Sequence, residues 1–312
     1  MGEGMPGQHS AAGEPPRQLA VPSAMHPPTL HRCPGGPRTA LFAPVVAAFL
    51  VGACATPEVR QPDLAALLAE STLVDLTHTF DETTIVWPTS NPFRLEKVAD
   101  GVTSGGYYYA ANNVHTAEHG GTHLDAPIHF AAGQQTAEAV PLSRLVGPAV
   151  VVDVTPLAEA DADALVTTAD LQTWEATHGA IDRGSLVLLR TGFSTRWPDA
   201  ARYLGTAARG AEGVAQLHFP GLHPDAATWL VQERGVGAVG IDTASIDRGQ
   251  STSFDAHRVL AAANVPAFEN LAHLDQLPAR GAFVCALPMK VGGGSGAPLR
   301  AVAVVPKESV RR

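Results

Sequence analysis

The chain has 312 residues, of which 45% are hydrophobic and only 16% are charged, so it can form one large core or two small ones. Its formal net charge of −9 argues against binding nucleic acid, which needs a basic surface for the phosphates. Three cysteines are too few for a disulfide framework, and Cys285, in an apolar run, is expected to be buried and unreactive.

The first sixty residues are predicted to be a leader outside the folded domain. Residues 1–38 are rich in Pro, Gly and His, and residues 41–53 form an apolar stretch. This stretch is shorter than the ~20 residues that span a bilayer, and it fits the apolar region of a secretory signal. Val51–Cys54 resembles the lipobox of bacterial lipoproteins, which predicts export to the periplasm and a lipid anchor on Cys54. Plain signal cleavage and a cytoplasmic extension are the alternatives.

Residues 61–312 are predicted to form a single α/β domain. Helices are expected at residues 62–70, 170–178, 225–234 and 255–263, with Thr168 and Gly179 bounding the second. Strands are expected at residues 73–76, 149–154, 185–189, 238–241, 267–269, 283–287 and 300–305. Helices and strands alternate between residues 149 and 270, which favours a sheet with helices packed on it. Residues 192–220 have no clear period and are expected to be a long loop.

The most informative segment is residues 119–130, HGGTHLDAPIHF. Its metal-binding side chains occupy positions of the same parity, namely His119, His123, Asp125 and His129. Alternate side chains of an extended segment share one face, so all four can point the same way. Imidazole nitrogen and carboxylate oxygen are ligands that zinc and manganese accept. The segment therefore predicts a site for Zn²⁺ or Mn²⁺ on extended chain.

Two other interpretations of this segment are weaker. His119 and His123 are four residues apart, as in helical zinc-protease motifs, but two glycines between them would weaken a helix and Pro127 would break one. The second interpretation is a surface loop that contains these histidines by chance. Chance does not explain why four of the 13 histidines lie within residues 115–129.

The residues of the segment are expected to divide the chemistry between them. His119, His123 and Asp125 supply three ligands, which leaves a position for water. Pro127 should turn the chain before His129, so we interpret His129 as a general acid–base beside the metal, with a further ligand as the alternative.

The segment also resembles the signature of the cyclase family, which includes bacterial kynurenine formamidase and isatin hydrolase. Every fixed position of the pattern His-x-Gly-Thr-His-x-Asp-x-Pro-x-His-Phe is met. Segments such as Trp87–Pro88, Phe268–Leu271 and Gly293–Pro298 extend the resemblance over roughly residues 73–305. The resemblance implies a swivelling β/β/α-type single domain, with a mixed central sheet and flanking helices, in a homodimer or larger assembly.

The resemblance implies site residues far from the motif. His257 and Glu269 have the twelve-residue spacing that completes a two-ion site in kynurenine formamidase. Asp125 and Glu269 would then bridge two ions, whereas isatin hydrolase is taken to use one manganese. Trp87 would lie against an aromatic substrate, and Phe93 is a second candidate for the pocket wall.

These observations predict a metal-dependent amidohydrolase. The substrate would be a small aromatic amide, either an arylformamide or a cyclic amide, whose carbon–nitrogen bond is cleaved by water that the metal activates. A periplasmic metal-binding lipoprotein without catalysis is one alternative, and a lactone hydrolase or dehydratase is another. Two acids that follow the strand at 238–241, Asp242 and Asp247, are interpreted as fixing loops.

Overall fold

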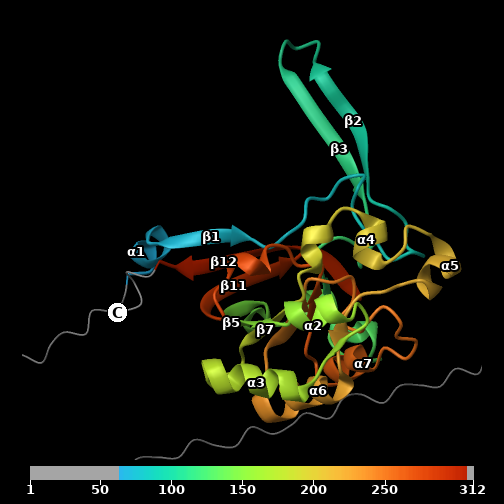
Figure 1. Ribbon diagram of the computed structural model, residues 1–312. Helices are drawn as coiled ribbons and strands as arrows, with labels where there is room; N and C mark the ends of the chain where they lie inside the picture. The colour runs from blue at the N-terminus through green and yellow to red at the C-terminus, as the bar shows by residue number, and fades with distance from the viewer. Residues whose placement is uncertain (1–62, 308–312) are drawn as a thin grey trace, which may run out of the picture. The chain divides into compact units, whose positions relative to one another are not determined.

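A mixed sheet of eight strands lies at the centre of residues 63–307, the part of the chain that this computed structural model describes (Figure 1). Its strand order is β1-β12-β11-β5-β7-β9-β10-β4, and β4 pairs with β12 as well as with β10, which closes the strands from β12 to β4 into a barrel. The strands are β1 Ser71–Asp75, β4 His123–Asp125, β5 Val146–Asp153, β7 Leu186–Arg190, β9 Ala238–Ile241, β10 Ala267–Glu269, β11 Arg280–Pro288 and β12 Gly296–Pro306.

The predicted α/β class and the mixed sheet are confirmed. Strands β5, β7, β9 and β10 run parallel to one another, and the other pairs of this sheet are antiparallel. Closure into a barrel was not foreseen, and the narrower swivelling description stays a prediction. The predicted leader, residues 1–60 with the signal segment and Cys54, lies outside the described residues.

Burial on both faces explains the continuous apolar strands. In β7, Leu186 and Leu188 belong to the core inside the barrel, whereas Val187 and Leu189 belong to the core between barrel and helices. Because successive side chains point to opposite faces, a strand buried on both sides needs apolar residues at every position. The same reasoning explains why Cys285 is only partly buried, against expectation: it points outward from β11, away from the barrel core.

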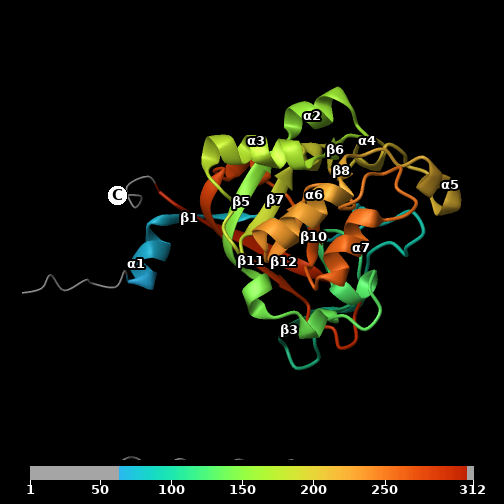
Figure 2. The same ribbon diagram turned by 90° about the horizontal axis from the view of Figure 1, so that it is seen from below.

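Helices cover the outer side of the parallel strands (Figure 2). They are α2 Thr155–Ala160, α3 Thr168–His178, α6 Pro224–Trp229 and α7 Asp255–Ala262. The N-cap of α3 is Thr167, one residue before the predicted Thr168, and its hydroxyl accepts a hydrogen bond from the backbone N–H of Asp170. Helix α6 continues as a π-helical turn, Leu230–Arg234, and ends at Gly235 as expected. Among the helices of the described residues, none has the length and apolarity that a bilayer crossing requires.

The expectation of a long loop at residues 192–220 is wrong. This stretch contains α4 Ala200–Leu204 and α5 Gly210–Ala215, and β8 Gly221–Leu222 follows it and pairs with β6 Leu165–Val166. A third core, with Phe193, Tyr203 and Phe219 fully buried, holds it against the barrel. Helix α1, Leu64–Ala69, precedes β1 as predicted.

A hairpin that the sequence analysis missed projects from the barrel (Figure 1). It consists of β2 Arg94–Val102 and β3 Tyr108–His115, which pair only with each other within the described chain. We call residues 94–115 the arm.

Candidate active site

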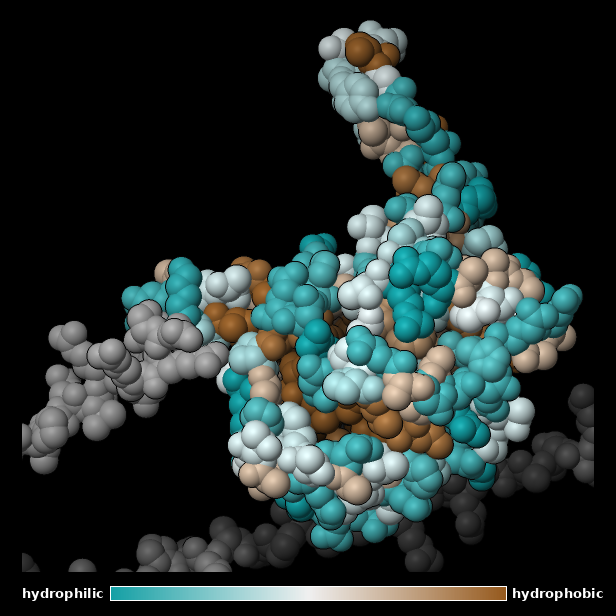
Figure 3. Space-filling view, in the orientation of Figure 1, coloured by the Kyte–Doolittle hydropathy of each residue, from teal (hydrophilic) through white to brown (hydrophobic). Residues whose placement is uncertain are grey.

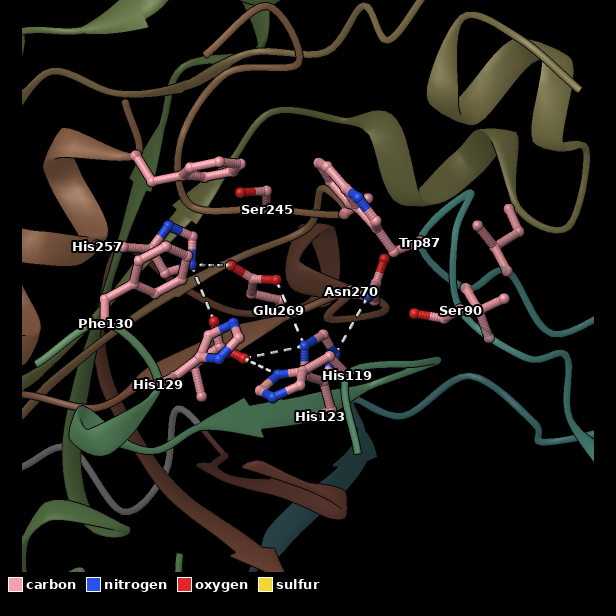
Figure 4. A pocket seen from close by; sticks show the side chains of 15 residues that line it. Trp87, Ser90, His119, His123, His129, Phe130, Ser245, His257, Glu269 and Asn270 are labelled. Carbon is pink, nitrogen blue, oxygen red and sulfur yellow. Dashed lines mark hydrogen bonds and ion pairs between the residues drawn. The ribbon is translucent and has the colours of Figure 1, made fainter. Parts of the chain in front are cut away.

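The barrel closure brings together the residues that the sequence placed far apart. Strand β4 pairs with β10 so that His123 lies opposite Glu269, and α7, which precedes β10, carries His257 (Figure 4). The predicted extended geometry holds for His123–Asp125. Pro127 then begins a 3₁₀ turn that ends at His129, so the chain turns where the sequence indicated.

A cavity of about 250 Å³ contains these groups. Its wall includes every predicted site residue except Phe93, namely Trp87, His119, His123, Asp125, His129, His257 and Glu269. Phe93 is instead buried against Phe80, with ring centroids 6.0 Å apart. Phe130 and Phe254, which the sequence analysis did not propose, complete the aromatic part of the wall.

Two buried carboxylates lie among three imidazoles. Asp125 Oδ1 is 2.6 Å from Nδ1 of His119 and 3.1 Å from Nε2 of His123, and Asp125 Oδ2 is 2.9 Å from Nε2 of His257. Glu269 Oε1 is 3.0 Å from the same nitrogen of His257, and Glu269 Oε2 is 3.4 Å from Nε2 of His123. Less than 5% of either acid is exposed, so water does not screen these charges.

The outer nitrogens of two of these rings donate to fixed acceptors. Nδ1 of His123 lies 2.9 Å from the carbonyl oxygen of Gly121, and Nδ1 of His257 lies 2.6 Å from a carboxylate oxygen of Asp247. Both partners can only accept, so both Nδ1 atoms carry the proton. In the neutral ring, the inner Nε2 atom then has the lone pair that a metal ligand needs.

The outer nitrogen of His119 is also held by a hydrogen bond, in this case through Ser295 to Glu118. Its Nε2 is 2.9 Å from Oγ of Ser295, and that hydroxyl donates to Oε2 of Glu118 at 2.6 Å. Since the serine proton is used on the carboxylate, the imidazole is the donor to the serine oxygen. In the neutral ring, Nδ1 of His119 then has the lone pair, at 2.6 Å from Asp125 Oδ1.

The inner nitrogens of three imidazoles face two buried carboxylates, so positive charge is needed between them, either as protons on the rings or as a bound cation. Nε2 of His123 is fully buried and has no hydrogen-bond partner among the described residues, although Oδ1 of Asp125 is 3.1 Å away. Burial raises the pKa of Glu269, and the negative charge of Asp125 raises it further. Burial would lower the pKa of His257, but its hydrogen bonds with the surrounding carboxylates raise it well above its ordinary value. The residues present therefore fit a divalent cation.

The ligand atoms form two overlapping groups, each within 4.8 Å: His123, Asp125 and Glu269, and His119, Asp125 and His129. Neither group contains both His119 and His123, and the predicted ligand set of His119, His123 and Asp125 stays a prediction. Asp125 belongs to both groups.

His129 lies at the edge of this cluster. Its ring stacks on that of His119, with centroids 3.8 Å apart and planes 18° apart. Burial lowers the pKa of His129 to about 4, so the ring is neutral near pH 7 and can accept a proton. The geometry is compatible with acid–base chemistry and with metal ligation, and the role of His129 stays a prediction.

Asp247 does more than fix a loop, the role that the sequence suggested for it. Besides His257 Nδ1, its carboxylate accepts from the backbone N–H groups of Ala256 and His257, at 3.0 and 3.1 Å. It thus sets the ring orientation at the start of α7. Asp242, in contrast, accepts from Thr191 and Gly192 and does hold a loop.

Ser295→Ala is expected to weaken metal binding by ~10–100-fold, because the substitution frees the His119 ring to rotate or to change its tautomer. Competition titration with a chromophoric chelator measures this affinity. Ser90→Ala is the matched control, since Ser90 lines the same cavity but has no hydrogen bond to a histidine ring within the described chain. Equal affinities of the two variants would contradict the role of Ser295.

The closed α/β barrel surrounds a cavity with aromatic walls, and the buried imidazoles and carboxylates in this cavity are typical of a metal-dependent enzyme. Known proteins share this fold. The family model described as putative cyclase matches residues 74–248, and the chain belongs to this cyclase family. The isatin hydrolase of Roseibium aggregatum is 36% identical over 212 residues, which are 65% of this chain and 78% of the relative. The kynurenine formamidase of Salinibacter ruber is 29% identical over 243 residues, 74% of this chain and 96% of the relative.

The solved structures to which this chain is similar include isatin hydrolases. Isatin hydrolase A from Ralstonia solanacearum has a TM-score of 0.69 and 35% identity, covering 79% of this chain and 98% of that one. An isatin hydrolase bound to the product analogue thioisatinate has a TM-score of 0.70 and 33% identity, covering 78% and 96%. The predicted class, a hydrolase acting on non-peptide carbon–nitrogen bonds, is confirmed by these relatives.

Proposed function

We propose that this hydrolase cleaves a carbon–nitrogen amide bond next to an aromatic ring, in a cyclic amide or an arylformamide, with one or two Zn²⁺ or Mn²⁺ ions. The observation that carries the proposal is the convergence of three imidazole nitrogens on Asp125 and Glu269 inside a cavity with aromatic walls. The names of the relatives, isatin hydrolase and kynurenine formamidase, support an amide substrate.

The cavity wall supports an aromatic substrate. The ring centroid of Phe254 lies 6.3 Å from Trp87 and 5.3 Å from Phe130, so three rings follow one another along the wall. Phe254 has a φ of 51°, a left-handed conformation that costs a bulky residue ~1–3 kcal/mol. Such strain is retained mainly at functional sites, and we assign Trp87, Phe130 and Phe254 to substrate contact.

The roles of the protein groups follow from their contacts. The metal, when bound, supplies Lewis acidity that makes water nucleophilic and polarises the carbonyl. His119, His123, Asp125, His257 and Glu269 would hold it. Asp247 and the Gly121 carbonyl keep two of the imidazoles in the tautomer that faces the acids. Neutral His129 takes the proton of the attacking water and returns it to the leaving nitrogen.

Metal analysis by mass spectrometry on the freshly purified full chain tests this proposal, followed by assays with that metal restored. We expect one to two equivalents of Zn²⁺ or Mn²⁺ and hydrolysis of isatins or arylformamides. Metal-loaded protein inert towards amides and lactones would show a metal-binding protein without this catalysis. Hydrolysis of lactones but not of amides would identify the enzyme as a lactone hydrolase instead.

We also propose export, with Cys54 as a lipid anchor, which the apolar stretch at residues 41–53 and the lipobox-like Val51–Cys54 support. Cys54→Ser is expected to move the protein from the membrane to the soluble fraction of a bacterial host, because one residue carries the lipid. Immunoblotting of the two fractions measures the shift, and Cys33→Ser is the control. Unchanged membrane association of Cys54→Ser would contradict the anchor. A homo-oligomer is proposed as well, on the basis of the family resemblance.

A further inference from the structure

The turn that carries Trp87 is fixed at its two ends by other parts of the barrel. Val86 forms a β-bridge with the segment before β4, and Phe93 is buried. Between them, the backbone N–H of Ser90 donates to the carbonyl oxygen of Trp87 at 2.9 Å and closes a β-turn. We call residues 87–92 the Trp87 turn. Because Trp87 lines the cavity of the candidate active site, the position of this turn sets the width of that cavity.

Two consecutive residues after α4 hold the Trp87 turn from outside. Nη1 of Arg209 donates to the carbonyl oxygen of Val86 at 3.5 Å, and Nη2 donates to that of Ser90. The backbone N–H of Gly210 donates to the carbonyl oxygen of Pro88 at 2.9 Å. Within the described chain, no other residue outside the Trp87 turn forms a hydrogen bond with it. The turn therefore depends on Arg209 and Gly210 for its orientation.

Helix α5 approaches the Trp87 turn closely because glycines leave room. Gly210, the first residue of α5, has a φ of 71°, a left-handed conformation that glycine adopts without strain. Gly213 is buried, and a Cβ atom there would lie 3.0 Å from Cβ of Pro88 and 2.2 Å from the carbonyl oxygen of Ala208. The start of α5 is thus shaped to receive Pro88, which places Arg209 beside the carbonyl groups of the turn.

A second cavity, of about 100 Å³, lies behind the Trp87 turn. Ile85 and Val86 line both cavities, whereas Trp87 lines the active-site cavity and Pro88 lines the second one. The opposite wall of the second cavity belongs to residues 198–209, which include α4. Protein interiors are otherwise close-packed, so the turn lacks support by side chains on this side and has space into which it can move.

We propose that Arg209 is a positioning residue that holds the Trp87 turn in the wall of the active-site cavity and so restricts the substrate to a small aromatic ring system. Without its hydrogen bonds the turn moves into the second cavity, and the active-site cavity accepts a larger fused ring. The inference rests on the proposed function, in which Trp87 contacts the aromatic part of the substrate. A misplacement of ~1 Å costs ~10²-fold in rate, so a residue outside the cavity can govern selectivity.

The guanidinium group of Arg209 suits this role. It is planar and presents several N–H donors in a fixed fork, so it binds two carbonyl oxygens at once in a defined geometry. Arg209 is exposed, and Figure 3 shows that α4 and α5 lie at the surface beside the base of the arm, with hydrophilic residues among them. Substitution of Arg209 therefore removes hydrogen bonds to the turn without opening a core.

Steady-state kinetics of Arg209→Met in the metal-restored full chain test the proposal with two substrates, isatin and a benzo-fused isatin. Methionine keeps much of the length but donates no hydrogen bond, so the turn keeps only its bond from Gly210. The kcat/KM for isatin is expected to fall by ~10-fold or more, mainly through a higher KM. The ratio of kcat/KM for the benzo-fused isatin to that for isatin is expected to rise by ~10-fold.

Arg202→Met is the matched control for these kinetics. Arg202 is exposed on α4, and its hydrogen bonds within the described chain do not involve the Trp87 turn. Both kcat/KM values are expected to equal those of the wild type.

A substitution in the second cavity tests where the turn goes. Ala200, the first residue of α4, lines this cavity, and a leucine there occupies part of the free space. In the double variant Arg209→Met/Ala200→Leu, the ratio of the two kcat/KM values is expected to return towards that of the wild type. A double variant with the ratio of Arg209→Met would contradict movement into the second cavity.

Fluorine NMR separates this inference from the proposed function, because it needs no hydrolysis. The chain has four tryptophans, so incorporation of 5-fluorotryptophan gives four signals, and Trp87→Phe identifies the signal of Trp87. Arg209→Met is expected to shift or broaden this signal and to leave that of Trp229, in α6, unchanged. Arg202→Met is expected to change neither.

Two further results would overturn the proposal. An unchanged Trp87 signal in Arg209→Met would show that Arg209 does not hold the turn, whether or not any amide is hydrolysed. A changed signal with an unchanged ratio of kcat/KM values would show that the turn moves without selecting the substrate. If no amide is hydrolysed, the proposed function fails, and the fluorine signal still decides whether Arg209 holds the turn. If circular dichroism shows that Arg209→Met does not fold, Arg209→Lys, which lacks the fork, replaces it in both measurements.

Discussion

Asp125→Asn is expected to remove bound metal and hydrolysis together. Within residues 63–307, Asp125 is the one side chain that contacts His119, His123 and His257, and it belongs to both candidate ligand groups. The amide has no charge and presents a donor where an acceptor is needed. Loss of a metal's charge stabilisation, several kcal/mol, corresponds to a fall in kcat/KM of ~10³-fold or more. Mass spectrometry of the metal content and steady-state kinetics measure the two effects.

The stability of Asp125→Asn separates loss of metal from loss of fold. The substitution removes the buried partner of His119, His123 and His257, so the metal-free variant is expected to melt below the metal-free wild type but still in one cooperative transition, which shows that it folds. Asp153→Asn is the control, because Asp153 is exposed and pairs with Arg190 instead. An Asp125→Asn protein that retains metal and turnover would refute the assignment of this residue.

Local sequence patterns predicted the parts of the fold whose burial is complete. The apolar runs of β5, β7 and β9 are continuous because barrel core and helix layer bury opposite faces, and a short continuous apolar run is typical of a buried strand. The sequence did not predict the two strands of the arm because most of their side chains are exposed. Exposed residues such as Lys97, Asp100 and Asn112 break the alternation of apolar and polar residues that indicates a strand. The pairing of β4 with β12, which closes the barrel, was not predicted because the three residues of β4, His123–Asp125, are too few to give a pattern.

The candidate site also contains residues that the sequence predicted and residues that it did not. His119, His123, Asp125 and His129 were found because they share one segment, and their spacing alone indicates a metal. Ser295 sits on the connection before β12, 176 residues from the imidazole that it contacts, so spacing could not join them.

Aromatic residues illustrate the limit most clearly. Phe93 and Phe254 look alike in sequence, yet Phe93 packs against Phe80 while Phe254 lines the cavity. Phe254 lies directly before α7 in a left-handed backbone conformation, which no local pattern indicates.

His129→Gln is expected to keep the metal while lowering kcat by ~10²-fold or more, the usual contribution of a positioned acid–base. The imidazole lies on His119 at the cavity wall and is neutral near pH 7, since burial lowers its pKa to about 4. Glutamine preserves much of the volume and polarity but cannot carry a proton between water and the leaving nitrogen. Steady-state kinetics on metal-restored protein measure the loss, and metal analysis accompanies it.

The metal content of His129→Gln distinguishes the two roles that the geometry allows. Retained metal with slow turnover identifies the proton shuttle, whereas a loss of metal would make His129 a ligand in the group with His119 and Asp125. His178→Gln, an exposed histidine at the end of α3, controls for general effects of the substitution and should leave both measurements unchanged. Full turnover in His129→Gln would exclude both roles, and the proton would then have to move through water or through Glu269.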